Sequence, residues 1–273
     1  MITCRTPFRI SLFGGGTDFP EWYKKNNGMV ISGTIDKYSY INVRRLPFIW
    51  NFKFRLRYYK SETANKVSRI KHGPYREIIK YFNLDKENIE IIHTADLPAL
   101  SGLGASSSST VGAINAIASF KKEFLSKKQI AQIAMHIEQE KLNEHVGSQD
   151  QIATAFGGFN KIFFKKDIDF TVESFLDRDK IEKLNKSTFL VYTGIQRKSQ
   201  LIEKKKMENL RKHKLDNNLA KIYEITQKAF EEFTKKKFNL KKIGKLLTDQ
   251  WNEKKSLANN ISNPTVEKIS KIC

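Results

Sequence analysis

Cysteine is scarce in this chain of 273 residues, where only Cys4 and Cys273 occur, near opposite ends. Two such cysteines predict neither a disulfide framework nor a zinc site, and the five histidines show no metal-ligand spacing with cysteine or acidic residues. Long apolar runs are also missing, and no basic segment followed by an apolar one opens the chain. We therefore expect a cytoplasmic protein with no membrane partner.

Acidic residues are the minority among the charged ones, with 29 Asp and Glu against 49 Lys and Arg, a formal charge of +20. Such an excess would suit a nucleic-acid binder. The lysines, however, are spread along the chain and concentrate between the apolar positions of the expected C-terminal helices, which is typical of solvated helix faces. We therefore expect no nucleic-acid partner, although a positive field would favour a substrate that carries phosphate.

The most informative stretch is PALSGLGASSSSTVGAINAIASF, residues 98–120. Gly102 and Gly104 permit a close backbone approach, and residues 111–118 then keep helical spacing, so the turn opens a helix whose N-terminal N–H groups favour an anion. The stretch is neither a Walker loop nor a G-x-G-x-x-G fingerprint. We interpret it as a phosphate-binding loop, and the alternative is a flexible Gly/Ser connector.

Apolar periodicity predicts a β-rich first part followed by helices, which is an α+β fold with a mainly antiparallel sheet. In the first part we expect strands at 2–13, interrupted at Pro7, at 29–46 as a hairpin around Asp36 and Lys37, at 48–59 and at 88–94, with a helix at 74–82. Later we expect an amphipathic helix at 127–142, a helix from Asp150 to Gly157, strands at 160–164 and 187–200, and helices beyond residue 198.

Several motifs resemble those of the GHMP small-molecule kinases, which include galactokinase, homoserine kinase and mevalonate kinase. PALSGLGASSSS is similar to their P-x-x-x-G-L-G-S-S-x motif, with Ala105 at the first motif serine. TPFRISLFGGGTDFP and GSQDQIATAFGGF resemble further elements in the form found in heptose-phosphate kinases, and TGIQRKS resembles the family's substrate-side T-G-x-x-R-x-S element. The resemblance implies an N-terminal ATP-binding domain at 1–165, a twisted mixed sheet with helices on one face, and a ferredoxin-like C-terminal domain at 166–273.

The resemblance also implies ATP and Mg²⁺ as cofactors. The ATP phosphates would be wrapped by the backbone of Gly102, Leu103, Gly104, Ala105, Ser106, Ser107 and Ser108. Ser106 and Glu138 would ligate Mg²⁺, with Ser107 as the fallback for the serine. Taken without the resemblance, Glu138 is a partly exposed carboxylate at the edge of a helix stripe.

The same resemblance assigns catalysis to Asp150, as the base for the sugar hydroxyl, and to Arg9, which would lie near Asp150 and keep it ionised. A helix cap or a structural ion pair is the alternative role for Asp150. Sugar binding would fall to residues of the first motif and of the TGIQRKS element, with Arg197 as the candidate for a substrate phosphate: Gly15, Gly16, Thr17, Asp18, Thr193, Gly194 and Arg197.

The implied reaction is phosphorylation of the anomeric hydroxyl of D-glycero-D-manno-heptose 7-phosphate, for nucleotide-activated heptose and surface glycan synthesis. A galactokinase- or fucokinase-like activity is the alternative within the family. Members continue into a third glycine-rich motif, and none occurs after residue 260. We therefore expect a truncated C-terminal domain. A homodimer is possible. A further alternative is a chain that binds nucleotide or sugar without turnover.

Overall fold

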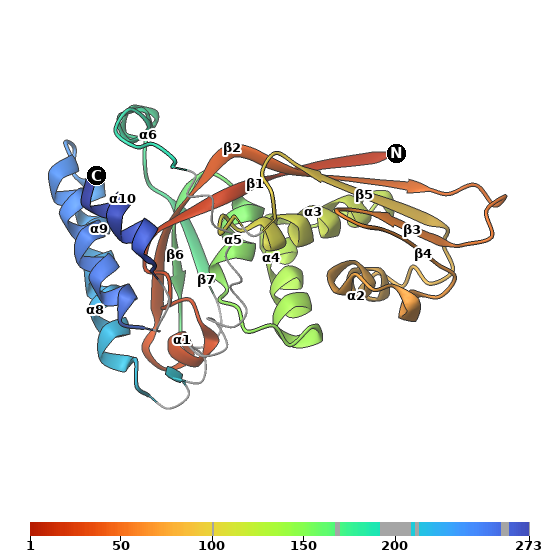
Figure 1. The fold of residues 1–273 in the computed structure, drawn as a ribbon, viewed down its shortest axis with the longest axis horizontal. Helices are drawn as coiled ribbons and strands as arrows, with labels where there is room; N and C mark the ends of the chain where they lie inside the picture. The colour runs from red at the N-terminus through yellow and green to blue at the C-terminus, as the bar shows by residue number, and fades with distance from the viewer. Residues whose placement is uncertain (100, 167–169, 192–208, 211–212, 258–261, 273) are drawn as a thin grey trace. The chain divides into compact units, whose positions relative to one another are not determined.

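The structure is a computed structural model that describes residues 1–99, 101–166, 170–191, 209–210, 213–257 and 262–272 (Figure 1). The chain divides into two compact units that interleave along the sequence. The first unit comprises Met1–Arg9, Thr34–Val146 and Asp150–Gly157, and the second comprises Ile10–Gly33, Gly147–Gln149 and Gly158–Cys273. Among the described residues, no helix has the length and apolarity needed to cross a membrane.

The first unit contains a mixed sheet. Its strands are the first part of β1 (Ile2–Phe13), the second part of β2 (Gly28–Arg45), β3 (Phe54–Arg57), β4 (Ser61–Ala64) and β5 (Ile89–Ala95). β5 runs antiparallel to β2, with Val43 opposite Ile91, and β3 runs parallel to β5. Alternate residues such as Ile41, Val43 and Ile91 are fully buried, so one face of this sheet forms the core.

Helices cover that face (Figure 1). They are the short 3₁₀ turn η1 (Val67–Arg69), α2 (Gly73–Tyr81), α3 (Ala105–Phe120), α4 (Lys127–Met135), the π-helical η2 (His136–Lys141) and α5 (Gln149–Phe156). α3 packs closely because its residues are small: a Cβ on Gly112 would lie 2.8 Å from Thr6 Oγ1 of β1. α4 begins at a capping box in which Ser126 and Gln129 bond each other's backbone N–H groups.

The second unit pairs the first part of β2 with β6 (Phe159–Phe164), and β6 with β7 (Phe170–Ser174). Its helices are α1 (Pro20–Asn26), α6 (Arg178–Asn185), α8 (Asp216–Thr234), α9 (Leu240–Lys255) and α10 (Pro264–Ile272). Phe233 of α8 is fully buried, and the rings of Phe13, Phe159 and Phe238 lie 6.2, 5.7 and 5.5 Å from its ring. This aromatic cluster is the core of the second unit.

The predicted hairpin at 29–46 is wrong, because β2 is one strand through Asp36 and Lys37. A two-residue hairpin turn needs positive φ at its centre, and neither residue has it. Instead, Gly28–Gly33 pairs with β6 and Ser39–Arg45 pairs with β5. β1 is likewise continuous through Pro7, since a strand tolerates proline where the missing N–H is not needed by its neighbour.

Other differences concern the ends of elements. The predicted helix at 127–142 is α-helical only to Met135 and continues as the π-helical η2. α1, η1, β4, β7 and α6 are additional elements, and the predicted strand at 48–59 is a strand only over β3. Residues 188–191 of the predicted strand at 187–200 are not in a strand. Residues 192–200 of that prediction lie outside the described residues.

Candidate active site

The glycine-rich loop, residues 101–104, lies directly before α3 in the first unit. Gly102 and Gly104 both have φ of +77°, a left-handed conformation that favours glycine. Gly104 is the N-cap residue of α3, and no side chain among the described residues caps this helix. The first N–H groups of α3 are therefore available to an anion at the positive end of the helix.

Arg9 of β1 holds this loop. Its backbone N–H donates to the carbonyl of Leu103 at 3.1 Å, and its Nη1 donates to the carbonyl of Gly102 at 3.1 Å. A Cβ on Gly104 would lie 3.0 Å from Arg9 Cγ, so a larger residue at 104 would push the arginine away. Glycine at this position thus serves both the left-handed turn and the close approach of Arg9.

The same guanidinium forms a bidentate ion pair with Asp150 in the first turn of α5. Arg9 Nε donates to Asp150 Oδ1 at 2.7 Å, and Nη2 pairs with Oδ2. The predicted proximity of the two residues is present in the structure. Asp150 keeps 27% of its side chain exposed, so its carboxylate remains accessible to a ligand.

Glu138 lies in η2 and is 1% exposed, so the alternative of a carboxylate at the edge of the stripe does not hold. Its Oε2 accepts hydrogen bonds from Ser107 Oγ at 2.9 Å and from Gln151 Nε2. Burial raises the pKa of Glu138 to about 7. Its Oε1 has no donor of acceptable geometry in the described part of the chain, although the nearby Thr110 hydroxyl acts to lower this pKa.

The two candidate serines occupy different faces of α3. Ser107 is buried and bonds Glu138, whereas Ser106 is exposed at the start of the helix. The structure therefore brings Ser107, the fallback residue, together with Glu138.

The glycine turn, residues 14–18, belongs to the second unit. Gly14 and Gly16 have φ of +84° and +116°, and the Thr17 hydroxyl donates to the carbonyl of Gly14 at 2.8 Å. Asp18 is 1% exposed, and its carboxylate accepts from the N–H of Gly16 at 2.7 Å and of Gln149 at 3.3 Å. Asp18 thus joins the turn to residues 147–149, which directly precede Asp150 in the chain.

Comparison with known proteins shows which kinases the chain resembles. Residues 67–158 match the GHMP kinases N terminal domain, and the chain is 29% identical over 280 residues to the D-glycero-alpha-D-manno-heptose 7-phosphate kinase of Campylobacter jejuni, covering 99% of this chain and 82% of that protein. Residues 67–158 therefore belong to the GHMP kinases N terminal domain. The homologues are kinases, so the chain is a phosphotransferase, and its α+β architecture is the GHMP kinase fold.

Solved structures agree with this fold. A crystal structure of a D-glycero-D-manno-heptose 1-phosphate kinase from Bacteriodes thetaiotaomicron has a TM-score of 0.78 at 23% identity, over 94% of this chain and 80% of that one. Streptococcus pneumoniae phosphomevalonate kinase, in complex with phosphomevalonate and AMPPNP, has a TM-score of 0.75 at 11% identity, over 99% and 85% of the two chains. The nucleotide in that complex, AMPPNP, is an analogue of ATP.

Two glutamines at the candidate site were not predicted from the sequence. Gln151, fully buried, bonds Glu138, and Gln250 of α9 accepts from the N–H of Gly14 at 2.6 Å and donates to the carbonyl of Leu12 at 2.7 Å. For Gln250 a signal existed, because it follows Ile243 and Leu246 on the buried stripe of α9. No signal in the sequence distinguishes Gln151.

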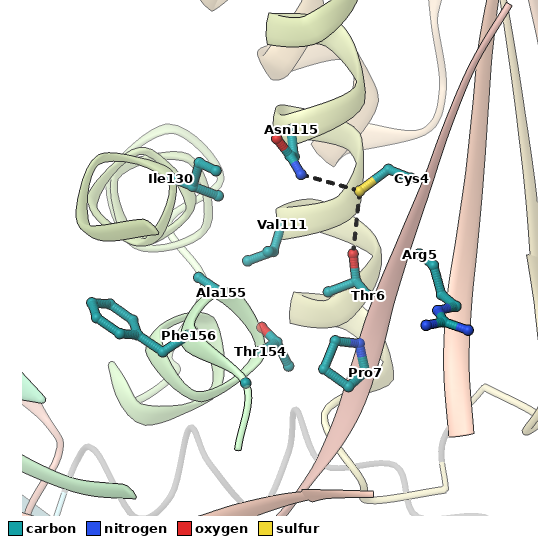
Figure 2. A pocket seen from close by; sticks show the side chains of 11 residues that line it. Cys4, Arg5, Thr6, Pro7, Val111, Asn115, Ile130, Thr154, Ala155 and Phe156 are labelled. Carbon is teal, nitrogen blue, oxygen red and sulfur yellow. Dashed lines mark hydrogen bonds between the residues drawn. The ribbon is translucent and has the colours of Figure 1, made fainter. Parts of the chain in front are cut away.

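The described residues of the first unit also form a hollow of about 140 Å³ between β1, α3, α4 and α5 (Figure 2). Asn115 Nδ2 donates to Cys4 Sγ at 3.4 Å there, and Thr6 Oγ1 lies 3.7 Å from the sulfur. None of the residues predicted from the sequence for catalysis or for nucleotide, metal or substrate binding lines this hollow. The remaining candidates, Thr193, Gly194 and Arg197, lie outside the described residues.

Proposed function

We propose that this chain is a GHMP kinase that transfers the γ-phosphoryl group of ATP to the anomeric hydroxyl of D-glycero-D-manno-heptose 7-phosphate, giving the 1,7-bisphosphate for synthesis of a nucleotide-activated heptose and a surface glycan. The observation that carries the proposal is the Arg9–Asp150 ion pair beside the glycine-rich loop. The similarity to the Campylobacter jejuni heptose 7-phosphate kinase supports the choice of sugar.

Phosphate binding is the role of the glycine-rich loop and the start of α3. The backbone of Gly102 to Ser108 would donate N–H groups to the β- and γ-phosphate oxygens, helped by the dipole of α3. This is consistent with the uncapped helix start and with the left-handed glycines, which let a ligand approach the backbone closely.

Glu138 and Ser107 fit a Mg²⁺ ion, because this ion prefers oxygen ligands and Glu138 Oε1 is a buried acceptor without a well-oriented donor in the described chain. They would hold the ion together with phosphate oxygens, and Ser106 remains the residue predicted from the motif for the same role. When bound, Mg²⁺ would neutralise charge on the phosphates.

Asp150 would act as the base. Its carboxylate would accept the proton of the anomeric hydroxyl while the hydroxyl oxygen forms a bond to the γ-phosphorus, the bond from that phosphorus to the β-bridging oxygen breaks, and ADP leaves. Arg9 would offset negative charge in the transition state and orient the carboxylate through its bidentate contact.

The acceptor sugar would be held by the glycine turn, through the backbone of Gly15 and Gly16 and through Thr17 and Asp18. The structure supports a positioning part in this role for Thr17 and Asp18, because both side chains are buried and bonded within the turn. Thr193, Gly194 and Arg197 remain predictions for the same substrate.

A coupled assay of ADP release tests the proposal with heptose 7-phosphate, galactose and fucose as acceptors. We expect turnover with the heptose phosphate, and turnover with the free sugars alone would instead favour the galactokinase- or fucokinase-like alternative. Tight Mg²⁺-dependent ATP binding without turnover on any acceptor would identify a nucleotide binder and refute the proposed reaction.

Asp150→Asn tests the mechanism. As a base, its loss should lower kcat by about 10²- to 10⁴-fold while ATP affinity is unchanged. Asp179→Asn is a matched control, because Asp179 is an exposed aspartate in the first turn of α6 and should leave kcat unaltered. An unchanged kcat in Asp150→Asn would leave the ion pair with Arg9 a purely structural role.

A further inference from the structure

Three polar side chains of the second unit converge on Gly15, and the roles above leave them without a function. A Cβ placed on Gly15 would lie 3.1 Å from Lys254 Nζ, 3.2 Å from Ser11 Oγ and 3.3 Å from Gln149 Nε2. These residues come from distant parts of the chain: β1, the start of α5 and the last turn of α9. An ammonium, a hydroxyl and an amide nitrogen are all hydrogen-bond donors, so three donors meet at one place.

Hydrogen bonds hold the backbone of Gln149 and the helical turn before Lys254 next to the glycine turn. The N–H of Gln149 bonds the Asp18 carboxylate at 3.3 Å, and Gln250, one helical turn before Lys254, bonds both Gly14 and Leu12. Gly15, unlike Gly14 and Gly16, has no positive φ. Glycine is therefore required at 15 for the space that the three donors occupy and not for its backbone conformation.

Two polar atoms of this group point to a missing ligand. Ser11 Oγ and Gln149 Oε1 are buried and make no hydrogen bond within the described residues. Leaving a buried polar atom unpaired costs about 1–3 kcal/mol, so such atoms usually have a partner in the functional state. A ligand with several oxygens would provide one, through a phosphate oxygen for the hydroxyl and a sugar hydroxyl for the amide oxygen.

We propose that Lys254, Gln149 and Ser11 form the subsite for the phosphate group of the sugar phosphate acceptor. The inference rests on the proposed function, since it concerns the same acceptor. An ammonium is a compact charge with three donors and suits an anion, whereas a neutral sugar hydroxyl would need no such charge. Sequence reasoning missed the subsite because Ser11, Gln149 and Lys254 are far apart in the chain and belong to no common motif.

Lys254→Met tests the subsite, because methionine keeps much of the side-chain length and removes the charge. We expect kcat/KM for heptose 7-phosphate to fall by about 10- to 100-fold, mainly through KM, as for the loss of a hydrogen bond to a charged group. The value for unphosphorylated heptose should change by less than about twofold. Lys255→Met is the matched control: it removes the same charge from the same helix, but Lys255 lies 3.6 Å from Glu267 Oε2.

Gly15→Ala is a second variant that leaves Lys254 in place. Its Cβ would displace the three donors by a few tenths of an ångström, so it should weaken the phosphorylated substrate selectively as well. Equal losses for phosphorylated and unphosphorylated heptose in both variants, or no loss, would overturn the subsite while leaving the proposed reaction intact.

The two proposals can fail separately. If the wild-type protein turns over no sugar, the proposed function fails, and the subsite is then tested by calorimetric titration of inorganic phosphate with AMPPNP filling the nucleotide site. Phosphate binding that is lost in Lys254→Met but kept in Lys255→Met would support the subsite. Equal binding by the variants and the wild type, or no binding at all, would overturn it.

Discussion

Replacing Glu138 by glutamine should change how stability depends on pH. Burial raises the pKa of Glu138 from 4.5 to about 7. Below pH 4.5 the group is protonated in both the folded and the unfolded chain and contributes nothing. Between about pH 4.5 and 7 the unfolded chain loses this proton first, so the free energy of unfolding falls as pH rises, and above about pH 7 the penalty is complete.

The size of the penalty follows from the shift. A pKa difference of about 2.5 units corresponds to about 3 kcal/mol, at 1.36 kcal/mol per unit, when the carboxylate is fully charged and no metal is bound. Glutamine removes it, because the amide stays neutral at every pH. Glutamine also fits: its oxygen can accept from Ser107 and Gln151, as Oε2 does, and its amide nitrogen can face the Thr110 hydroxyl.

Urea unfolding with EDTA, at intervals from pH 5 to pH 8.5, measures the effect. We expect Glu138→Gln to exceed the wild type by less than about 1 kcal/mol near pH 5 and by about 3 kcal/mol at pH 8. Glu140→Gln is the matched control, because Glu140 lies in the same π-helical turn but is 71% exposed beside His136. Parallel curves for the wild type and Glu138→Gln would refute a buried carboxyl of raised pKa.

Further predictions concern the glycine-rich loop and the core. Gly104→Ala should lower kcat/KM for ATP at least tenfold, because the left-handed φ costs a non-glycine residue about 1–2 kcal/mol and the new Cβ displaces Arg9. Gly102→Ala is the control for backbone strain alone, because its Cβ would meet no atom within 4 Å. Equal effects of the two variants would argue against a role for the Arg9 contact. Phe233→Ala should lower the free energy of unfolding, measured with urea, by about 3–5 kcal/mol, because it leaves a cavity in the aromatic core of the second unit. Phe124→Ala is the control: Phe124 is 99% exposed, so its loss should change the free energy of unfolding by less than about 0.5 kcal/mol.

The sequence was informative where periodicity and turn residues agree. α2 and β5 begin and end within one residue of the predicted bounds, and α3 follows the glycine turn as predicted, because small or apolar residues at regular spacing lie between strong turn signals. The sequence was misleading where the neighbouring strands decide the structure. β2 alternates on both sides of Asp36 and Lys37 as a hairpin would, and only its two different neighbours, β6 and β5, make it a single strand.

Candidate site residues that lie in recognisable motifs could be found, whereas those that depend on the direction of a side chain in the folded protein could not. Arg9 and Asp150 came from separate motifs and do form a pair. Gln250 and Lys254 lie in a helix more than two hundred residues from the turn they contact, so their contacts with Gly14 and Gly15 arise only from tertiary packing.

The choice between Ser106 and Ser107 shows why a motif alone leaves a metal ligand undecided. Neighbouring residues on a helix point about 100° apart, so only one of two adjacent serines can face a given partner. Ser107 shares its face with Thr110, three residues on, and both lie beside Glu138; Ser106 is turned to solvent. Glu138 is in turn positioned by η2, which places its side chain inside the first unit. There Gln151, the neighbour of Asp150 in the chain, donates to the same Glu138 oxygen as Ser107. The carboxylate proposed for the metal and the carboxylate proposed as base are therefore tied to adjacent residues of α5, so a shift of this helix would move both together.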